Sequence, residues 1–81
     1  MEAPWSTGTI KKMDKDKRLG IIVDTDGSEV LFALDDLILP ESVSDAAELA
    51  NVQDTVIFQK VPSKFGSEAK KIAILDQKMK K

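Results

Sequence analysis

Five short runs of apolar and β-branched residues alternate with polar stretches that contain Gly, Pro, Asp and Ser. Runs of this length and composition are typical of β-strands, and the intervening residues are typical of turns. The pattern predicts strands at residues 7–13, 19–23, 30–34, 55–59 and 71–75. Within them, the alternation predicts a core of seven residues: Ile10, Ile22, Leu31, Ala33, Val56, Phe58 and Ile72.

The connections add detail to this pattern. Residues 14–17 form an alternating charge run that predicts a tight loop, and Asp26-Gly27 predicts a hairpin turn. Residues 45–48 resemble a capping box that opens one helical turn, whereas residues 61–67 have the composition of a loop. Gly20, inside a strand, indicates a bulge or a close backbone approach. The longest connection follows the third strand, which predicts an all-β, five-stranded antiparallel Greek-key barrel, the OB fold.

Composition narrows the possible functions. The 81 residues include no Cys and no His, which excludes thiol and imidazole nucleophiles, zinc sites built from those ligands, and disulfides. No Gly-rich phosphate loop is present, so we expect no enzyme, no cofactor and no metal site. No apolar run approaches the roughly 20 residues of a membrane span. We expect a cytoplasmic binding domain with a lead at residues 1–6, a barrel at 7–75 and a flexible Lys-rich tail at 76–81.

The net charge of −2 hides a strong segregation of charge along the chain. Residues 1–18 carry five bases and three acids, residues 19–59 carry nine acids and no base, and residues 60–81 carry seven bases and two acids. If the two ends of the chain meet in space, this distribution predicts a basic face and an acidic face.

Several motifs resemble the bacterial cold-shock proteins. The family opens with Gly-x-Val-Lys-Trp-Phe-Asn and continues, after a short loop, with Lys-Gly-Phe-Gly-Phe-Ile; here residues 8–14 (GTIKKMD) and 17–22 (KRLGII) have the same spacing. The family's Val-Phe-Val-His-Phe strand resembles residues 31–35 (LFALD), after a similar Asp-Gly-Ser turn. Its Val-Ser-Phe strand resembles residues 56–58, and its Gly-x-x-Ala-x-x-Val resembles residues 66–72. The resemblance covers about residues 8–75, except for a longer connection at 36–52, and implies the barrel.

Cold-shock proteins stack bases of single-stranded nucleic acid on aromatic side chains of their first three strands. In this alignment the chain keeps only Phe32 of those rings and has Lys12, Met13, Leu19, Ile21, Leu34 and Asp35 at the other positions. The resemblance and the basic loops together predict weak, salt-sensitive binding of RNA or single-stranded DNA through one or two stacks. The candidate binding residues are Lys11, Lys12, Lys17, Arg18, Phe32, Lys60, Lys64 and Phe65.

The sequence is also compatible with a second function, the binding of a protein. With the family's strand alternation, the outer face of the second and third strands carries a row of aliphatic side chains, which lack the flat ring that stacks on a base. This face, formed by Met13, Leu19, Ile21 and Leu34, would suit a protein partner or a homodimer, or lie beneath the 36–52 connection.

Overall fold

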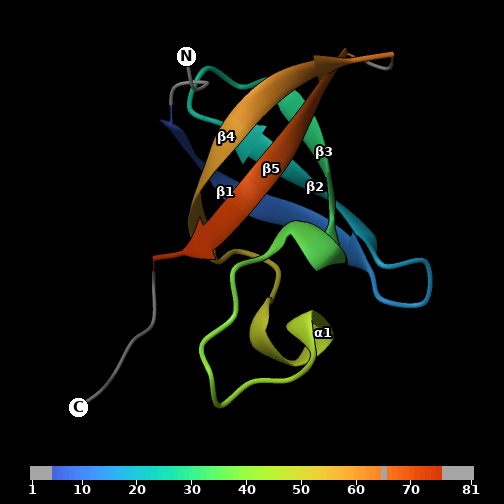
Figure 1. Cartoon of the computed structure of the whole chain (residues 1–81). Helices are drawn as coiled ribbons and strands as arrows, with labels where there is room; N and C mark the ends of the chain where they lie inside the picture. The colour runs from blue at the N-terminus through green and yellow to red at the C-terminus, as the bar shows by residue number, and fades with distance from the viewer. Residues whose placement is uncertain (1–4, 65, 76–81) are drawn as a thin grey trace.

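The computed structural model describes residues 5–64 and 66–75, which form a closed five-stranded barrel (Figure 1). Its strands are β1 (Trp5–Asp14), β2 (Leu19–Asp24), β3 (Glu29–Ala33), β4 (Thr55–Ser63) and β5 (Gly66–Ile74). Between β3 and β4 lie a short 3-10 turn, η1 (Leu34–Asp36), and one helical turn, α1 (Ala46–Leu49). The predicted all-β barrel is confirmed. Of the predicted lead at 1–6, residues 1–4 lie outside the described residues, as does the predicted tail at 76–81, whereas Trp5 and Ser6 belong to β1.

The strand order around the barrel is β1-β2-β3-β5-β4, and β4 closes the ring against β1. Four of the strand pairs are antiparallel, whereas β3 and β5 are parallel. The expectation of a fully antiparallel barrel is therefore wrong at this one pair. The reason is geometric: five strands in a closed ring cannot alternate in direction all the way round, so one neighbouring pair must run parallel.

The hairpin between β4 and β5 differs from the sequence prediction. Residues 61–67 were expected to form a loop, but β4 continues to Ser63 and β5 begins at Gly66, so only two residues connect them. Pro62 is exposed near the end of β4, where a missing N–H costs the strand ladder little. Gly66 has a φ of +114°, which supplies the left-handed backbone that the tight turn requires.

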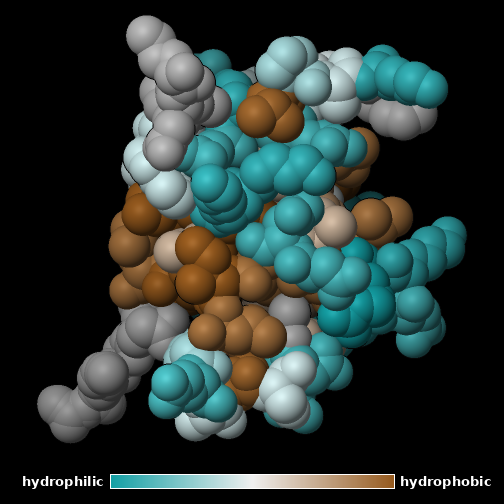
Figure 2. Space-filling model, in the orientation of Figure 1, coloured by the Kyte–Doolittle hydropathy of each residue, from teal (hydrophilic) through white to brown (hydrophobic). Residues whose placement is uncertain are grey.

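The long connection closes one end of the barrel. Leu37 and Ala50 from this connection are buried with the strand residues of the core. Asp45 caps α1, since its carboxylate accepts a hydrogen bond from the backbone N–H of Ala47 at 3.1 Å, as the capping pattern predicted. Other apolar residues of the connection, such as Ile38, remain exposed. The surface of the molecule has a hydrophobic area in this view (Figure 2).

Inside the barrel, most of the predicted core is confirmed. Buried side chains include Ile10, Ile22, Val56, Phe58 and Ile72, each with no exposed surface. On β3 and the residue that follows it, however, the expected inward and outward residues are exchanged: Phe32 and Leu34, the first residue of η1, are buried, Leu31 is 38% exposed, and Ala33 is only partly buried.

Gly20 explains the orientation of β3. It lies opposite Phe32 on the neighbouring strand, and a Cβ atom at Gly20 would lie 2.5 Å from Cε1 of the Phe32 ring. The ring thus occupies the space that any larger residue would need, and it packs inward over bare backbone. The close approach indicated by Gly20 in the sequence is confirmed. Once Phe32 points inward, period-two alternation directs Leu31 outward.

An ion pair joins β2 to β4. The carboxylate of Asp24, which is only 7% exposed, accepts a hydrogen bond from the Lys60 ammonium at 2.6 Å and another from the Thr25 N–H at 2.6 Å. The hydrogen bond from Lys60 is the main cause that lowers the pKa of Asp24, and burial acts against it. The same hydrogen bond raises the pKa of Lys60.

We expect Gly20→Ala to destabilise the barrel by about 1–3 kcal/mol, because the added methyl group overlaps the Phe32 ring. In a domain of this size, each kcal/mol lowers the melting temperature by about 4–8 °C. The measurement is thermal unfolding of wild type, Gly20→Ala, Phe32→Leu and the double variant. The double variant should be less destabilised than the sum of the two single changes, because the smaller side chain makes room for the methyl group. Additive effects would contradict the close packing of the two residues.

We expect Asp24→Asn to lower the free energy of unfolding by about 1–3 kcal/mol at neutral pH, since it removes a charged hydrogen bond. The folded pKa of Asp24 is below its ordinary value of 3.8, so its contribution is present above that pH and is lost as the pH falls through the folded pKa. The difference between wild type and variant should therefore stay constant from about pH 7 to pH 5 and shrink below about pH 4. Denaturant titrations across this range measure it, with Glu41→Gln as the exposed control. A difference that persists unchanged into strong acid would contradict the ion pair.

Candidate functional site

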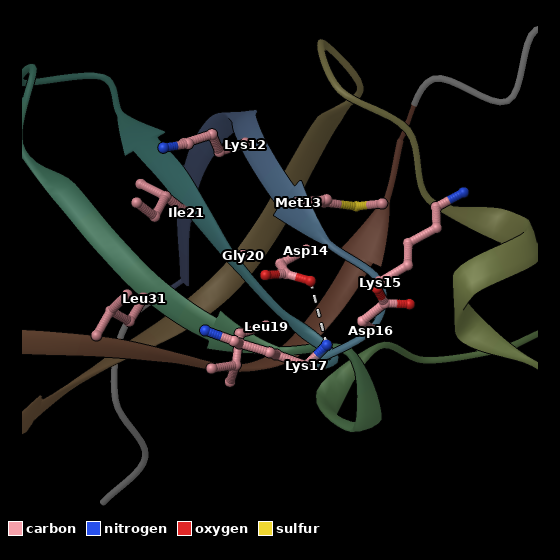
Figure 3. A pocket seen from close by; sticks show the side chains of 10 residues that line it. All are labelled: Lys12, Met13, Asp14, Lys15, Asp16, Lys17, Leu19, Gly20, Ile21 and Leu31. Atoms are coloured by element: carbon pink, nitrogen blue, oxygen red, sulfur yellow. Dashed lines mark hydrogen bonds between the residues drawn. The ribbon is translucent and has the colours of Figure 1, made fainter.

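The outer face of the first three strands contains a shallow, open groove of about 500 Å³, which we call the β1–β3 groove (Figure 3). Strand β1, the turn after it, β2 and one residue of β3 supply its walls. The lining residues are Lys12, Met13, Asp14, Lys15, Asp16, Lys17, Leu19, Gly20, Ile21 and Leu31.

Strand pairing produces the floor of the groove. Ile21 pairs with Lys12 on one side and with Leu31 on the other, so these three side chains form a row across the sheet. A register shift between Ile10 and Lys12 allows Ile10 to remain in the core while Lys12 lies exposed. Leu19 and Leu31 are 48% and 38% exposed, so the floor is aliphatic and open to solvent. Met13 turns away from Lys12 and packs partly against the core (Figure 3).

Three lysines stand at the rim of this groove. Lys12, Lys15 and Lys17 are exposed, and none of them forms an ion pair within residues 5–64 and 66–75. Two acids share the rim, and Asp14 accepts a hydrogen bond from the backbone N–H of Lys17 at 3.2 Å, which shapes the turn. Because the Lys17 bond uses the backbone, its ammonium group is left available. The groove therefore has a modest positive charge around an apolar floor.

Three other cations that the sequence suggested for binding are already paired. Lys11 forms an ion pair with Glu29, and Lys60 forms the pair with Asp24. The guanidinium of Arg18 donates to Asp35 at 2.8 Å and to Asp45 at 3.2 Å. A phosphate would have to displace these carboxylates to use the three side chains.

Arg18 has a structural role in this arrangement. It adopts a left-handed backbone, with φ of 59°, and its C=O accepts the backbone N–H of Leu34 at 3.0 Å. Its hydrogen bond with Asp35 is the main cause that raises its pKa. The Asp45 carboxylate that it contacts is also the cap of α1, and the Ala47 N–H is the main cause that lowers the pKa of Asp45. Arg18 thus ties the turn after β1 to the connection that closes the barrel.

Two candidate residues are corrected by the orientation of β3. Phe32 is only 2% exposed, so it cannot stack on a base, and Leu34 has no exposed surface, so it cannot contribute to an interface. Leu31 takes the outward position that the sequence assigned to Phe32. Sequence reasoning missed Leu31; the signal that could have found it is Gly20, which pairs with Phe32 across β2 and β3.

The remaining candidates are placed as follows. Lys64 is exposed in the turn between β4 and β5, and Phe65 lies outside the described residues. Trp5, which was not among the candidates, lies at the start of β1, is 49% exposed and is not a lining residue of the groove. The third possibility for the aliphatic face, cover by the 36–52 connection, is not seen in the groove itself, because no residue of that segment lines the groove with Leu19 and Ile21.

Two structural features are absent from the described residues. These residues contain no group of three or more Asp or Glu side chains placed to hold a metal ion. No helix within them has the length and apolar character to span a membrane.

Comparison with known proteins extends the fold assignment. No family model and no curated protein matches the chain. Among solved structures, the chain is similar to the Drosophila Unr CSD456 structure, a cold-shock-domain protein, with a TM-score of 0.69 and 16% sequence identity. The match covers 98% of this chain and 30% of that one, so the chain spans less than a third of the length of this structure. Membership of the bacterial family stays a prediction, whereas the fold is shown: the chain is a small closed five-stranded barrel of the cold-shock, OB-like type.

Proposed function

We propose that this protein binds single-stranded RNA or DNA weakly, along the β1–β3 groove. The observation that carries the proposal is the set of three lysines that form no ion pair with another described residue, at the rim of an open, solvent-exposed groove. The cold-shock type of the fold supports it, because the outer face of the first three strands is where the resemblance noted in the sequence implies binding.

The rim and the floor of the β1–β3 groove would contribute differently to the binding of a nucleic-acid strand. Lys12, Lys15 and Lys17 would contact phosphates, which gives affinity that depends on salt and not on base sequence. The bases would lie against the aliphatic floor of Leu19 and Leu31, which offers apolar contact but no aromatic ring. Stacking on aromatic side chains contributes about 1–3 kcal/mol per base, so a groove without it binds more weakly. The expected dissociation constants are those of non-specific binding, about 10⁻⁴ to 10⁻⁶ M.

The same geometry predicts little preference among sequences. Reading a base requires donors or acceptors at its edge, and the floor side chains are hydrocarbon. Only the lysine ammonium groups at the rim donate, and they suit phosphate oxygens. We therefore expect similar affinities for uridine and deoxythymidine oligomers of equal length.

A protein segment is the competing occupant of this groove. Leu19, Ile21 and Leu31 would also accept an apolar side chain, and the lysines would then pair with acids beside it. Of the two, the nucleic acid is favoured because the fold is of the cold-shock type and the lysines are unpaired. The salt dependence of oligonucleotide binding distinguishes these two ligands.

We expect the affinity for a labelled single-stranded oligonucleotide to fall with salt with a log–log slope of about −2, the value for about three phosphates on a single strand. Lys12→Gln with Lys17→Gln should reduce the slope to about −0.7, because only one rim cation remains. Fluorescence anisotropy between about 20 and 150 mM salt measures both slopes.

The matched control for this experiment is Lys71→Gln, an exposed lysine of β5 that is not part of the groove, and it should leave the slope nearly unchanged. Equal losses from the control and the groove variant would indicate a general charge effect and contradict the site. No measurable binding by the wild type at low salt would contradict nucleic acid as the ligand and favour the protein segment.

A further inference from the structure

A second apolar surface lies away from the β1–β3 groove, where the connection after β3 runs beside the end of β5. Ile38 donates its backbone N–H to the Ile72 C=O at 2.7 Å, and Leu37 forms a parallel bridge with Ile72. The result is a hollow of about 270 Å³, which we call the Ile38 patch, lined by Ile38, Leu39, Pro40, Leu49, Ala73 and Ile74. A space-filling view shows the surrounding hydrophobic area of the surface (Figure 2).

The exposure of this patch requires an explanation. Ile38 is 53% exposed and the adjoining Leu75 is 51% exposed, although the core of so small a domain has few apolar residues to spare. Single exposed apolar side chains are ordinary, but a contiguous group of them marks an interaction surface. The groove and the patch share no lining residue, so this chain carries two separate apolar surfaces.

The charged residues around the Ile38 patch and around the β1–β3 groove are opposite in sign. Residues 37–54, which supply most of the patch, carry four acids and no base. Two of these acids, Glu41 and Glu48, are exposed next to patch residues and form no ion pair within the described chain. The groove has three unpaired lysines around an aliphatic floor. Each surface therefore has the apolar centre and the charged rim that complement the other.

We propose that the Ile38 patch of one molecule docks into the β1–β3 groove of a second copy of this chain. A symmetric contact of patch against patch would place like charges together, which is unfavourable, whereas patch against groove pairs acids with lysines. Such a contact is head-to-tail, so each molecule keeps one surface free and association can continue. Both surfaces are small, and the contact is of the weak, transient class. The proposal does not depend on nucleic-acid binding.

The test uses two variants, each of which blocks one surface with an acid at an exposed position. Leu19→Asp with Leu31→Asp blocks the groove, and Ile38→Asp blocks the patch. Val52→Asp is the matched control for Ile38→Asp, because Val52 is 49% exposed, lies in neither surface and receives the same single charge. Thermal unfolding of all three variants checks that each remains folded.

Sedimentation equilibrium from about 10 μM to about 1 mM then measures the mass. Wild type and Val52→Asp should rise above the chain mass of 8.9 kDa with concentration, and each blocked variant should remain at that mass. An equimolar mixture of the two blocked variants should form a dimer and nothing larger, because one intact groove and one intact patch remain.

Three results would overturn the proposal. The first is a wild type that stays monomeric throughout the concentration range. The second is a mixture of the two blocked variants that does not associate, because an intact groove and an intact patch would then have failed to bind each other. The third is loss of association in Val52→Asp, which would indicate a general charge effect.

Discussion

The contact between the Phe32 ring and the bare backbone of Gly20 determines which residues this barrel presents to solvent. The ring lies where a Cβ of residue 20 would be, so Phe32 can point inward only opposite a glycine. With Phe32 inside, the alternation of β3 places Leu31 outside, beside Ile21 of β2. The register shift in β1 then brings Lys12 to the other side of Ile21. The floor and one rim cation of the groove thus follow from one packing contact and one irregularity.

Ion pairs determine which of the basic residues remain available. Three of the basic residues are held by carboxylates: Lys11 pairs with Glu29 of β3, Arg18 with Asp35 and Asp45, and Lys60 of β4 with Asp24 of β2. Among the described lysines that form no ion pair, Lys12, Lys15 and Lys17 line the groove, whereas Lys64 and Lys71 lie elsewhere. A surface with a few free cations and no ring suits loose, sequence-independent contact with a flexible strand, and the same features suit weak contact with an acidic apolar surface.

Much of the fold could be predicted from the sequence, because strands, turns and the helix cap depend on local residue chemistry. The Asp26-Gly27 turn and the Asp45 cap are examples in which a side chain or a glycine acts within a few residues. The orientation of β3 could not be predicted from its own residues. Residues 30–34 are all apolar, so no polar side chain marks the outer face, and a one-residue slip exchanges the two faces.

Which basic residues are free to contact a ligand also could not be predicted from the sequence. Lys60 and Asp24 are 36 positions apart, and only the closed barrel brings them together. The same holds for Arg18 and Asp45, which are 27 positions apart. A count of the basic residues in the loops therefore overstates the positive charge that a ligand could use. The same count cannot identify Leu31, because Leu31 is uncharged and lies in a run of apolar residues.

The most direct test of the proposed binding surface is an NMR titration of the full chain with a short oligouridine, in which amide and methyl signals are followed. Binding along the groove should shift the methyl signals of Leu19, Ile21 and Leu31 and the amides of Lys12 and Lys17. The signals of Ile38 and Leu75 should shift only to the extent that the oligonucleotide releases a second copy, and at low protein concentration they should not move. Shifts confined to the Ile38 patch, or none at all at low salt, would contradict the β1–β3 groove as the nucleic-acid surface.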